Sequence, residues 1–301
     1  MLAPAPLLAP APLLAPAKVN LYLHVLGRRA DGYHDLDSLF VRVGLADRIW
    51  LRPADQDRLE VTGPFASTLD GDNPADNLVM CALALARRET GRGDHFHVTL
   101  EKNIPVAAGL GGGSADAAAV LNAMPDLFGR ALDLEALARE LGADVLPCLI
   151  EAPILVSGTG DVVALAPSLP ACALVLVNPR LPLATPAVFA ARTGPFSASR
   201  SLIESAPTLD ALLAALASRG NDLEAAACGL APVIGACLEA LAACPAVGLT
   251  RMSGSGATCF GLVASLAEAR HAAQAIAGAH PDWWVEATPL LGGPDTTLQP
   301  M

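Results

Sequence analysis

The sequence has no C-x-x-C pair among its seven cysteines, and the odd number leaves one without a partner. Zinc sites and disulfide frameworks typically contain closely spaced pairs of cysteines, so neither is indicated. We expect the cysteines to be reduced and to pack as small buried hydrophobic residues, in a protein of a reducing compartment. The cysteines lie mostly in apolar runs, at Cys81, Cys148, Cys172, Cys228, Cys237, Cys244 and Cys259.

Long apolar runs are also missing, because charges and prolines interrupt each one before the roughly 20 residues that cross a bilayer. We therefore expect a soluble, cytoplasmic protein with no membrane partner. Lysine is scarce: Lys18 and Lys102 are the only two among 19 basic residues, so each draws attention as a candidate functional residue. The net charge of −11 argues against nucleic acid as a partner, so a phosphate site here requires a local positive pocket.

The first residues repeat a Leu-Ala-Pro-Ala-Pro unit up to Lys18, with five prolines. These prolines prevent the helical core of a signal peptide, and no basic residue precedes it. We interpret residues 1–13 as a disordered Pro/Ala/Leu extension. The remaining chain, 53% hydrophobic over the whole sequence, is long enough for one large domain or two packed ones.

Four glycines occur in five positions, at Gly109 and in the run 111–113. Such a loop lets backbone N–H groups converge on an anion without obstruction by Cβ atoms. Ser114 is predicted to cap a helix over 115–121, whose positive N-terminal end favours phosphate. The alternative is a flexible turn before a core helix. No Gly-Lys-Ser/Thr follows, so this is not a P-loop.

The hydrophobic periodicity predicts an α+β protein. After about residue 170, strands and helices alternate in a way that suits an α+β sandwich better than a doubly wound sheet. A second small-residue loop occupies residues 253–258. Strands are expected at 19–25, 36–43, 49–52, 58–62, 95–101, 153–157, 173–178, 247–252, 259–263 and 284–288, and helices at 77–88, 133–141, 209–219, 222–230, 232–243 and 265–278.

Three polar residues leave their roles open. His95 and His97 lie on one face of a predicted strand, where a solvated surface is favoured over metal binding because no third ligand is in view. Asp144 is a carboxylate among apolar residues, which is costly to bury unless it is paired. It is either a functional acid or an ordinary turn or N-cap residue.

Three motifs occur in one order: Pro16–Leu21, then Pro105 with Gly109–Ser114, then Ser253–Ala257. Together they resemble the motifs of the GHMP kinase superfamily. Within it, the chain is most similar to the kinases of 4-diphosphocytidyl-2-C-methyl-D-erythritol. The segments that select this family are Arg29–His34, Asp76–Leu78 and Leu141–Val145, and the resemblance spans Pro16 to about Leu290.

This resemblance implies a two-domain α+β fold with the active site in the cleft between the domains. Residues 14–165 would form an ATP-binding domain like domain 2 of ribosomal protein S5. Residues 166–301 would form a ferredoxin-like α/β sandwich on the substrate side. The last strand, near 284–288, is a candidate to pack back on the first domain.

The resemblance also implies a reaction. Lys18 and Asp144 match the catalytic pair: Asp144 as general base on a hydroxyl that attacks the γ-phosphate of ATP, Lys18 as its charge partner. Mg²⁺ would come with the nucleotide, near Ser114, without a dedicated side-chain cage. The residues implied to bind ATP are Asn77, Leu78, Pro105, Val106, Ala107, Ala108, Gly109, Leu110, Gly111, Gly112, Gly113, Ser114 and Ala115.

The implied substrate is the 2-hydroxyl of 4-diphosphocytidyl-2-C-methyl-D-erythritol, in the non-mevalonate route to isoprenoid precursors. Tyr33, His34 and Phe189 match the aromatic residues that hold cytosine. Asn20, Thr185 and Asp144 complete the substrate side. We expect a monomer or a weak homodimer.

Two departures from the family pattern are Pro147, one residue late, and Asp161 in place of a frequent glutamate. Homoserine or mevalonate kinase is an alternative, but those substrates contain no base on which Tyr33 and His34 could stack. A non-catalytic nucleotide sensor is another, although Lys18 together with Asp144 speaks against it. A purely structural protein would not need two glycine-rich loops.

Overall fold

The computed structural model describes residues 11–198 and 206–292. They form two compact units, each of which collects separate stretches of the chain. The first unit takes the described residues up to Ala17, then Ala46–Val106 and Gly112–Leu149. The second takes Lys18–Leu45, Ala107–Gly111 and the described residues from Ile150 onwards. The predicted division at 165/166 stays a proposal.

In the first unit, three strands form the sheet. The second half of β2 (His34–Ala54) pairs antiparallel with β4 (His95–Glu101), and β3 (Arg58–Thr62) pairs parallel with β4. Strand β4 has the alternating pattern of a half-buried strand, with Phe96, Val98 and Leu100 buried. Two short 3₁₀ turns follow β3, at Ala66–Leu69 and Pro74–Asp76.

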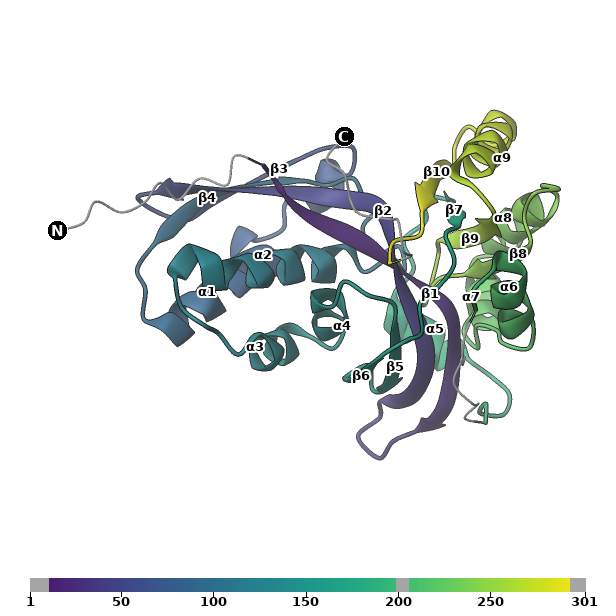
Figure 1. Cartoon of the computed structure of the whole chain (residues 1–301), viewed down its shortest axis with the longest axis horizontal. Coiled ribbons are helices and arrows are strands. Elements are labelled where there is room, and N and C mark those ends of the chain that lie inside the picture. Colours follow the sequence, from purple (N-terminus) through teal and green to yellow (C-terminus); the bar gives the residue numbers. More distant parts are fainter. Residues whose placement is uncertain (1–10, 199–205, 293–301) are drawn as a thin grey trace. The chain divides into compact units, whose positions relative to one another are not determined.

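Helices α1 (Leu78–Thr90), α2 (Gly112–Phe128), α3 (Leu134–Leu141) and α4 (Val145–Leu149) complete the first unit. Small residues let α2 approach its neighbours α1 and α4 closely (Figure 1). Helix α1 begins where the Asn77 side chain accepts a hydrogen bond from Val79 N, and α3 is capped in the same way by Asp133.

Two expectations for this unit were wrong in detail. Helix α2 begins at Gly112, so Ser114 lies inside its first turn and does not cap it. Little room is left beside this first residue, because a Cβ on Gly112 would lie 3.1 Å from Ile104 Cγ2. Strand β1 (Leu13–Arg28) begins at Leu13, within the expected extension, whose residues 1–10 lie outside the described residues.

In the second unit, residues 36–40 of β2 pair antiparallel with β5 (Ile154–Gly158), which pairs with β6 (Val162–Leu165). Strand β1 also pairs with β2. A separate antiparallel sheet has the order β10 (Trp284–Pro289), β7 (Ala173–Asn178), β9 (Cys259–Val263), β8 (Leu249–Met252). The α+β class is as predicted.

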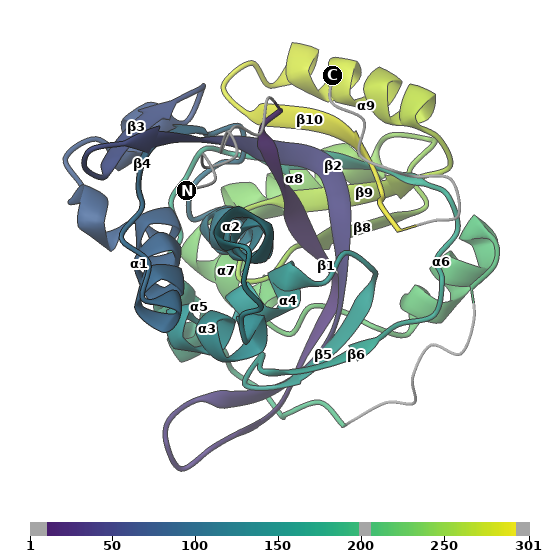
Figure 2. The same ribbon diagram turned by 60° about the vertical axis from the view of Figure 1, so that its left-hand side comes forward.

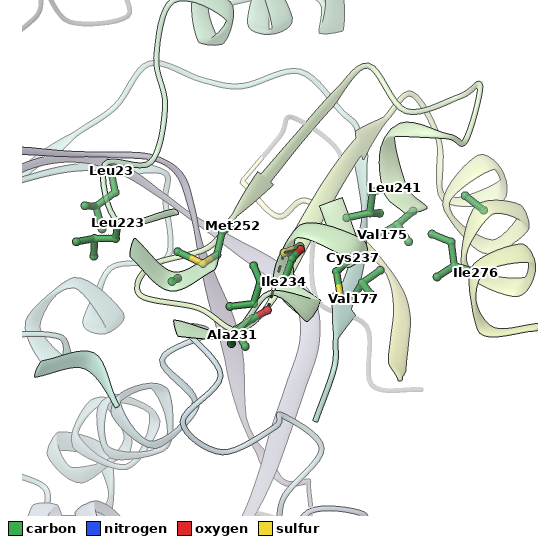
Figure 3. Packing of buried hydrophobic residues seen from close by; sticks show 14 of the residues in the cluster. Leu23, Val175, Val177, Leu223, Ala231, Ile234, Cys237, Leu241, Met252 and Ile276 are labelled. Atoms are coloured by element: carbon green, nitrogen blue, oxygen red, sulfur yellow. Dashed lines mark hydrogen bonds between the residues drawn. The ribbon is translucent and has the colours of Figure 1, made fainter. Parts of the chain in front are cut away.

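Helices α8 (Val233–Ala242) and α9 (Leu266–Ala279) pack on this sheet (Figure 2). Ile234 and Leu241 of α8 and Ile276 of α9 meet Val175 and Val177 of β7 in the core (Figure 3). Burying such side chains contributes about 1.5–3 kcal/mol each. The remaining helices of this unit are α5 (Thr185–Ala191), α6 (Leu209–Ala217) and α7 (Glu224–Leu230).

All seven cysteines lie in the described residues and are free thiols, buried or half-buried, as expected. Burial raises the pKa of the Cys172 thiol to about 11, so it stays protonated at neutral pH. None of the helices within residues 11–198 and 206–292 is both long and apolar enough to cross a membrane.

Candidate active site

The glycine loop rests on β1 in the second unit. Lys18 N donates a hydrogen bond of 3.0 Å to Leu110 O. A Cβ on Gly111 would lie 2.8 Å from Lys18 Cγ, so only glycine permits this approach. The loop backbone is left-handed at Ala107, Gly109 and Gly111, with φ of 52°, 78° and 65°. Ala107 alone adopts this conformation with a side chain, which costs of order 1–3 kcal/mol.

The second glycine loop, between β8 and β9, lies directly against the first. Ser253 Oγ donates to Gly109 O at 3.0 Å and accepts from Asn20 N at 3.1 Å. Thr258 N donates to Ala108 O at 3.2 Å. The structure therefore brings together, in one unit, residues from all three motifs that the sequence singled out.

Lys18 is buried at this junction, 7% exposed. Its Nζ donates to Asn20 Oδ1 at 2.7 Å and lies 4.5 Å from the centre of the Phe40 ring. Asn20 Nδ2 in turn donates to Ser38 Oγ at 2.9 Å, which fixes the amide orientation. A neutral amide and an aromatic face hold this ammonium in place without neutralising its charge.

The start of α2 lies in the first unit, where it adjoins the start of α1. Gly113 is exposed, and a Cβ there would meet only Leu78 Cδ1, at 3.7 Å. The N–H groups of the first helical turn have no acceptor within the helix, and the helix dipole is positive there. This open, donor-rich helix end is chemically suited to a phosphate group, and Leu78 borders it with an apolar side chain.

Asp144 also belongs to the first unit, immediately before α4. The concern that its carboxylate is buried among apolar residues was wrong: Asp144 is exposed, whereas the next four residues are buried. The apolar side chains point away from it because α4 turns them inward. Its pairing with Lys18 stays a prediction. The displaced Pro147 is accommodated at the third position of α4, within the first turn, where proline is tolerated.

His34 and Phe189 stack on each other in the second unit, with ring centres 4.8 Å apart and planes 25° apart. Burial, together with Arg28 and Arg192, lowers the pKa of His34, so its ring is neutral at pH 7. Tyr33 is 68% exposed beside it in the chain.

Thr185, at the start of α5, shares a 2.7 Å hydrogen bond with Ser255 Oγ. Ser255 belongs to the second glycine loop, so Thr185 is attached to the same group of contacts as Lys18 and Asn20. The short helix α5 therefore carries two of the predicted substrate residues, Thr185 and Phe189.

Two polar residues that the sequence pattern did not single out hold the second glycine loop, and a third holds β1. Asn221 Nδ2 donates to Met252 O and Gly254 O, at 2.8 and 2.7 Å. Glu224 accepts from Met252 N at 2.9 Å, and Asp222 accepts from the backbone of β1. Their signal in the sequence is a polar Asn-Asp-Leu-Glu run ahead of an apolar helix, the side-chain types that bond to nearby backbone.

The two histidines of β4 each lie near a carboxylate. His95 Nδ1 lies 3.4 Å from Asp57, and His97 Nε2 lies 3.4 Å from Glu60. Within the described residues, no group of three or more His, Cys, Asp or Glu side chains is arranged to hold a metal. His95 is exposed and His97 is half-buried, and the choice of a solvated strand face over a metal site stays a prediction.

Two family models match this chain. Residues 77–166 match the GHMP kinases N terminal domain, and residues 201–282 match the GHMP kinases C terminal domain. The chain belongs to the GHMP kinase family. Its first glycine loop falls within the N-terminal match, and its second falls within the C-terminal match.

Relatives in this family carry a narrower name. The 4-diphosphocytidyl-2-C-methyl-D-erythritol kinase of Paramagnetospirillum magneticum is 51% identical over 280 residues, covering 91% of this chain and 96% of the relative. The kinase of the same name from Rhodospirillum rubrum is 47% identical over 286 residues, covering 94% and 93%.

Solved GHMP kinase structures resemble this fold. A crystal structure of 4-(cytidine 5′-diphospho)-2C-methyl-D-erythritol kinase matches with a TM-score of 0.77 and 36% identity, covering 93% of this chain and 99% of that one. Homoserine kinase from Cytophaga hutchinsonii matches with a TM-score of 0.69 at 19% identity, covering 94% and 95%. That second likeness is one of fold alone.

The junction of the two glycine loops makes a stability prediction. In Gly109→Ala the new Cβ would meet Ser253 O at 2.3 Å, at a φ that disfavours side chains. We expect a loss of at least about 1–3 kcal/mol in the free energy of unfolding, measured by urea denaturation. Gly113→Ala is the matched control, since its Cβ is unobstructed and alanine favours helix by about 1 kcal/mol. Equal stability of both variants would contradict the close approach.

Proposed function

We propose that this chain is an ATP-dependent kinase that phosphorylates the 2-hydroxyl of 4-diphosphocytidyl-2-C-methyl-D-erythritol, giving the 2-phosphate and ADP. The observation that carries the proposal is its 51% identity, over 91% of the chain, to a kinase named for this substrate. The stacked pair of His34 and Phe189 supports the cytidine part, because a planar base needs an aromatic partner. The reaction would serve the non-mevalonate route to isoprenoid precursors, in the cytoplasm, as a monomer or weak homodimer.

The nucleotide is assigned to residues 105–115 together with Asn77 and Leu78. The start of α2 fits a phosphate because Gly113 leaves its N–H groups open. Leu78, next to Gly113, offers an apolar contact for the adenine ring. Ser114 in the first turn of α2 offers a hydroxyl oxygen beside the phosphates, a ligand type suited to Mg²⁺.

When bound, ATP with Mg²⁺ supplies the phosphoryl group. Asp144, exposed and therefore able to meet a substrate, accepts the proton of the 2-hydroxyl as that oxygen becomes the nucleophile. A positioned base of this kind contributes about 10²–10⁴ in rate. Lys18, held by Asn20, stabilises negative charge on the transferring group.

The substrate side is assigned to the second unit. His34 and Phe189 hold cytosine, with Tyr33 free to cover it, while Asn20 and Thr185 contact the remainder. A neutral His34 ring presents one N–H donor and one acceptor, which suits the edge of a base better than an imidazolium with two donors.

The direct test is ADP release from ATP and Mg²⁺, with 4-diphosphocytidyl-2-C-methyl-D-erythritol, homoserine and mevalonate as acceptors. We expect turnover with the cytidine compound alone, and product phosphorylated at the 2-hydroxyl by phosphorus NMR. Turnover with another alcohol would keep the kinase and overturn the substrate. ATP binding without turnover on any acceptor would favour a nucleotide sensor.

Asp144→Asn tests the base. We expect both substrates to bind with wild-type affinity while kcat falls by about 10²–10⁴, because an amide cannot accept the proton. Asp133→Asn is the matched control in the same unit: an asparagine still caps α3, so kcat should not change. A kcat of Asp144→Asn within about threefold of wild type would remove Asp144 from this role.

His34→Ala tests the cytosine subsite. Stacking on a base contributes about 1–3 kcal/mol, so KM for the cytidine substrate should rise roughly 5- to 150-fold while KM for ATP stays constant. His280→Ala removes a comparable stacked pair, with Trp283, and serves as the control. An equal rise in KM for the cytidine substrate and in KM for ATP in His34→Ala would place His34 outside the subsite.

A further inference from the structure

A buried ionic cluster lies in the first unit beside the glycine loop. Lys102 Nζ donates to Asp116 Oδ2 at 2.7 Å and also to Asp47 Oδ2. None of the three side chains is more than 3% exposed. Lys102 is one of only two lysines in the chain, and none of the three motifs includes it.

Asp47, on β2, also holds the chain just before the loop. Its Oδ1 accepts hydrogen bonds from Asn103 N at 2.5 Å and Ile104 N at 2.8 Å. The backbone N–H of Lys102 donates to Thr62 O at 2.8 Å. The segment that leads into Pro105 is therefore fixed at three successive N–H groups.

Asp116 holds the other end of the loop. It is the fifth residue of α2, one turn beyond Gly112. A Cβ on Gly112 would lie 3.3 Å from Lys102 Nζ, so the ammonium sits tightly against the start of the helix. One ammonium thus connects the segment entering the loop to the first turns of the helix leaving it.

Stability alone is a weak reason for such a cluster. Replacing a buried ionic cluster by apolar residues of similar volume is often neutral or stabilising, because the charges lose their hydration. Asp116 Oδ1 is buried and, within the described residues, has no hydrogen-bond partner, which adds to the cost. The cluster is, however, well placed to hold the ends of the loop at a fixed separation.

We propose that Asp47, Lys102 and Asp116 are positioning residues for the nucleotide, which set the separation and direction of the two ends of the glycine loop. The inference rests on the proposed ATP-binding function. The three residues touch no reacting atom. They act by keeping the N–H groups at the start of α2 aimed at the phosphates, so their loss weakens nucleotide binding rather than the chemical step.

In this proposal, Asp116 carries a proton when the cluster positions the loop. Two carboxylates and one ammonium would leave one negative charge beneath a helix start that must attract phosphate. Burial raises the pKa of Asp116 to about 8; Lys102 opposes this shift and Asp47 adds to it. Burial lowers the pKa of Lys102, but the two carboxylates outweigh it and raise that pKa, so Lys102 stays charged. Loss of the Asp116 proton as the pH rises therefore adds one negative charge to the cluster.

The test measures binding of a non-hydrolysable ATP analogue with Mg²⁺ by calorimetry on the full chain. Asp116→Asn keeps an oxygen acceptor for Lys102, so at pH 7 we expect affinity within twofold of wild type. Asp116→Leu keeps the branching of the side chain but offers no acceptor, and we expect affinity to fall about tenfold or more. KM for the cytidine substrate should stay unchanged in both.

The pH profile separates positioning from mere stability. Between pH 7 and pH 9 the wild type should lose affinity for the analogue by at least threefold, as Asp116 loses its proton. Asp116→Asn cannot ionise and should keep its affinity across this range.

Asp57→Asn is the matched control, because Asp57 makes the same kind of contacts at the opposite end of β4. It accepts from Phe96 N at 3.0 Å and from Arg87 Nη2 at 2.5 Å. This variant should lower the melting temperature without changing affinity for the analogue.

Wild-type affinity in a folded Asp116→Leu at pH 7 would overturn the positioning role. Identical pH profiles for wild type and Asp116→Asn would overturn the role of the proton, and this comparison decides even if Asp116→Leu does not fold. If the wild type binds no ATP analogue, the proposed function is overturned. That result is distinct from the variant comparisons, which require a wild type that binds.

Discussion

The contact between the backbones of Gly109 and Ser253 is the constraint on which the second unit depends. The carbonyl of Ser253 occupies the space that a Cβ on Gly109 would need. Around this contact, Ser253 Oγ bonds to Gly109 and Asn20, and Asn20 orients Lys18. Asn20 and Ser253, which are 233 positions apart in the chain, are thereby held together at a point where only glycine leaves enough room.

Polar side chains, rather than apolar packing, hold this junction. Asn221 and Glu224 bind the backbone at Met252, just before the second glycine loop, and Asn221 also binds Gly254 within it. Arg251, buried in β8, donates to the carbonyls of Leu21, Leu216 and Arg219. Because buried backbone groups must be satisfied, irregular loops inside a protein need such side chains. The apolar core under α8 and α9 supports the junction but does not shape it.

The sequence predicted most of the elements, because their periodicity is local. The strands expected at 36–43 and 49–52 are, however, one strand, β2, and β6 and α4 were not predicted. The predicted strands at 95–101 and 173–178 coincide with β4 and β7, and Asp133 caps α3 as its position suggests. The expectation for Ser114 failed because α2 begins two residues earlier, at Gly112, which places Ser114 inside the first turn. The exposure of Asp144 was missed for a similar reason: the direction of α4, and not the apolarity of its neighbours, decides burial.

The same limit applies to the candidate site. Lys18, Asn20 and the glycine loops could be recognised because their motifs are contiguous. The contacts of Asn221, and the cluster of Asp47, Lys102 and Asp116, join residues far apart in the chain, and no local pattern records such pairs.

The scarcity of lysine has a further consequence for the chemistry of the surface. Both lysines of the sequence are buried, Lys18 at 7% and Lys102 at 3% exposure, so the exposed cationic side chains of the described surface are arginines. Acylating reagents and lysine-directed modifications therefore meet no accessible ε-amino group while the fold is closed. The two ε-amino groups that do exist adjoin the glycine loop, one at β1 and one beneath α2. Their acylation would report opening of the regions around that loop, because the chain has no other lysine side chain that could react.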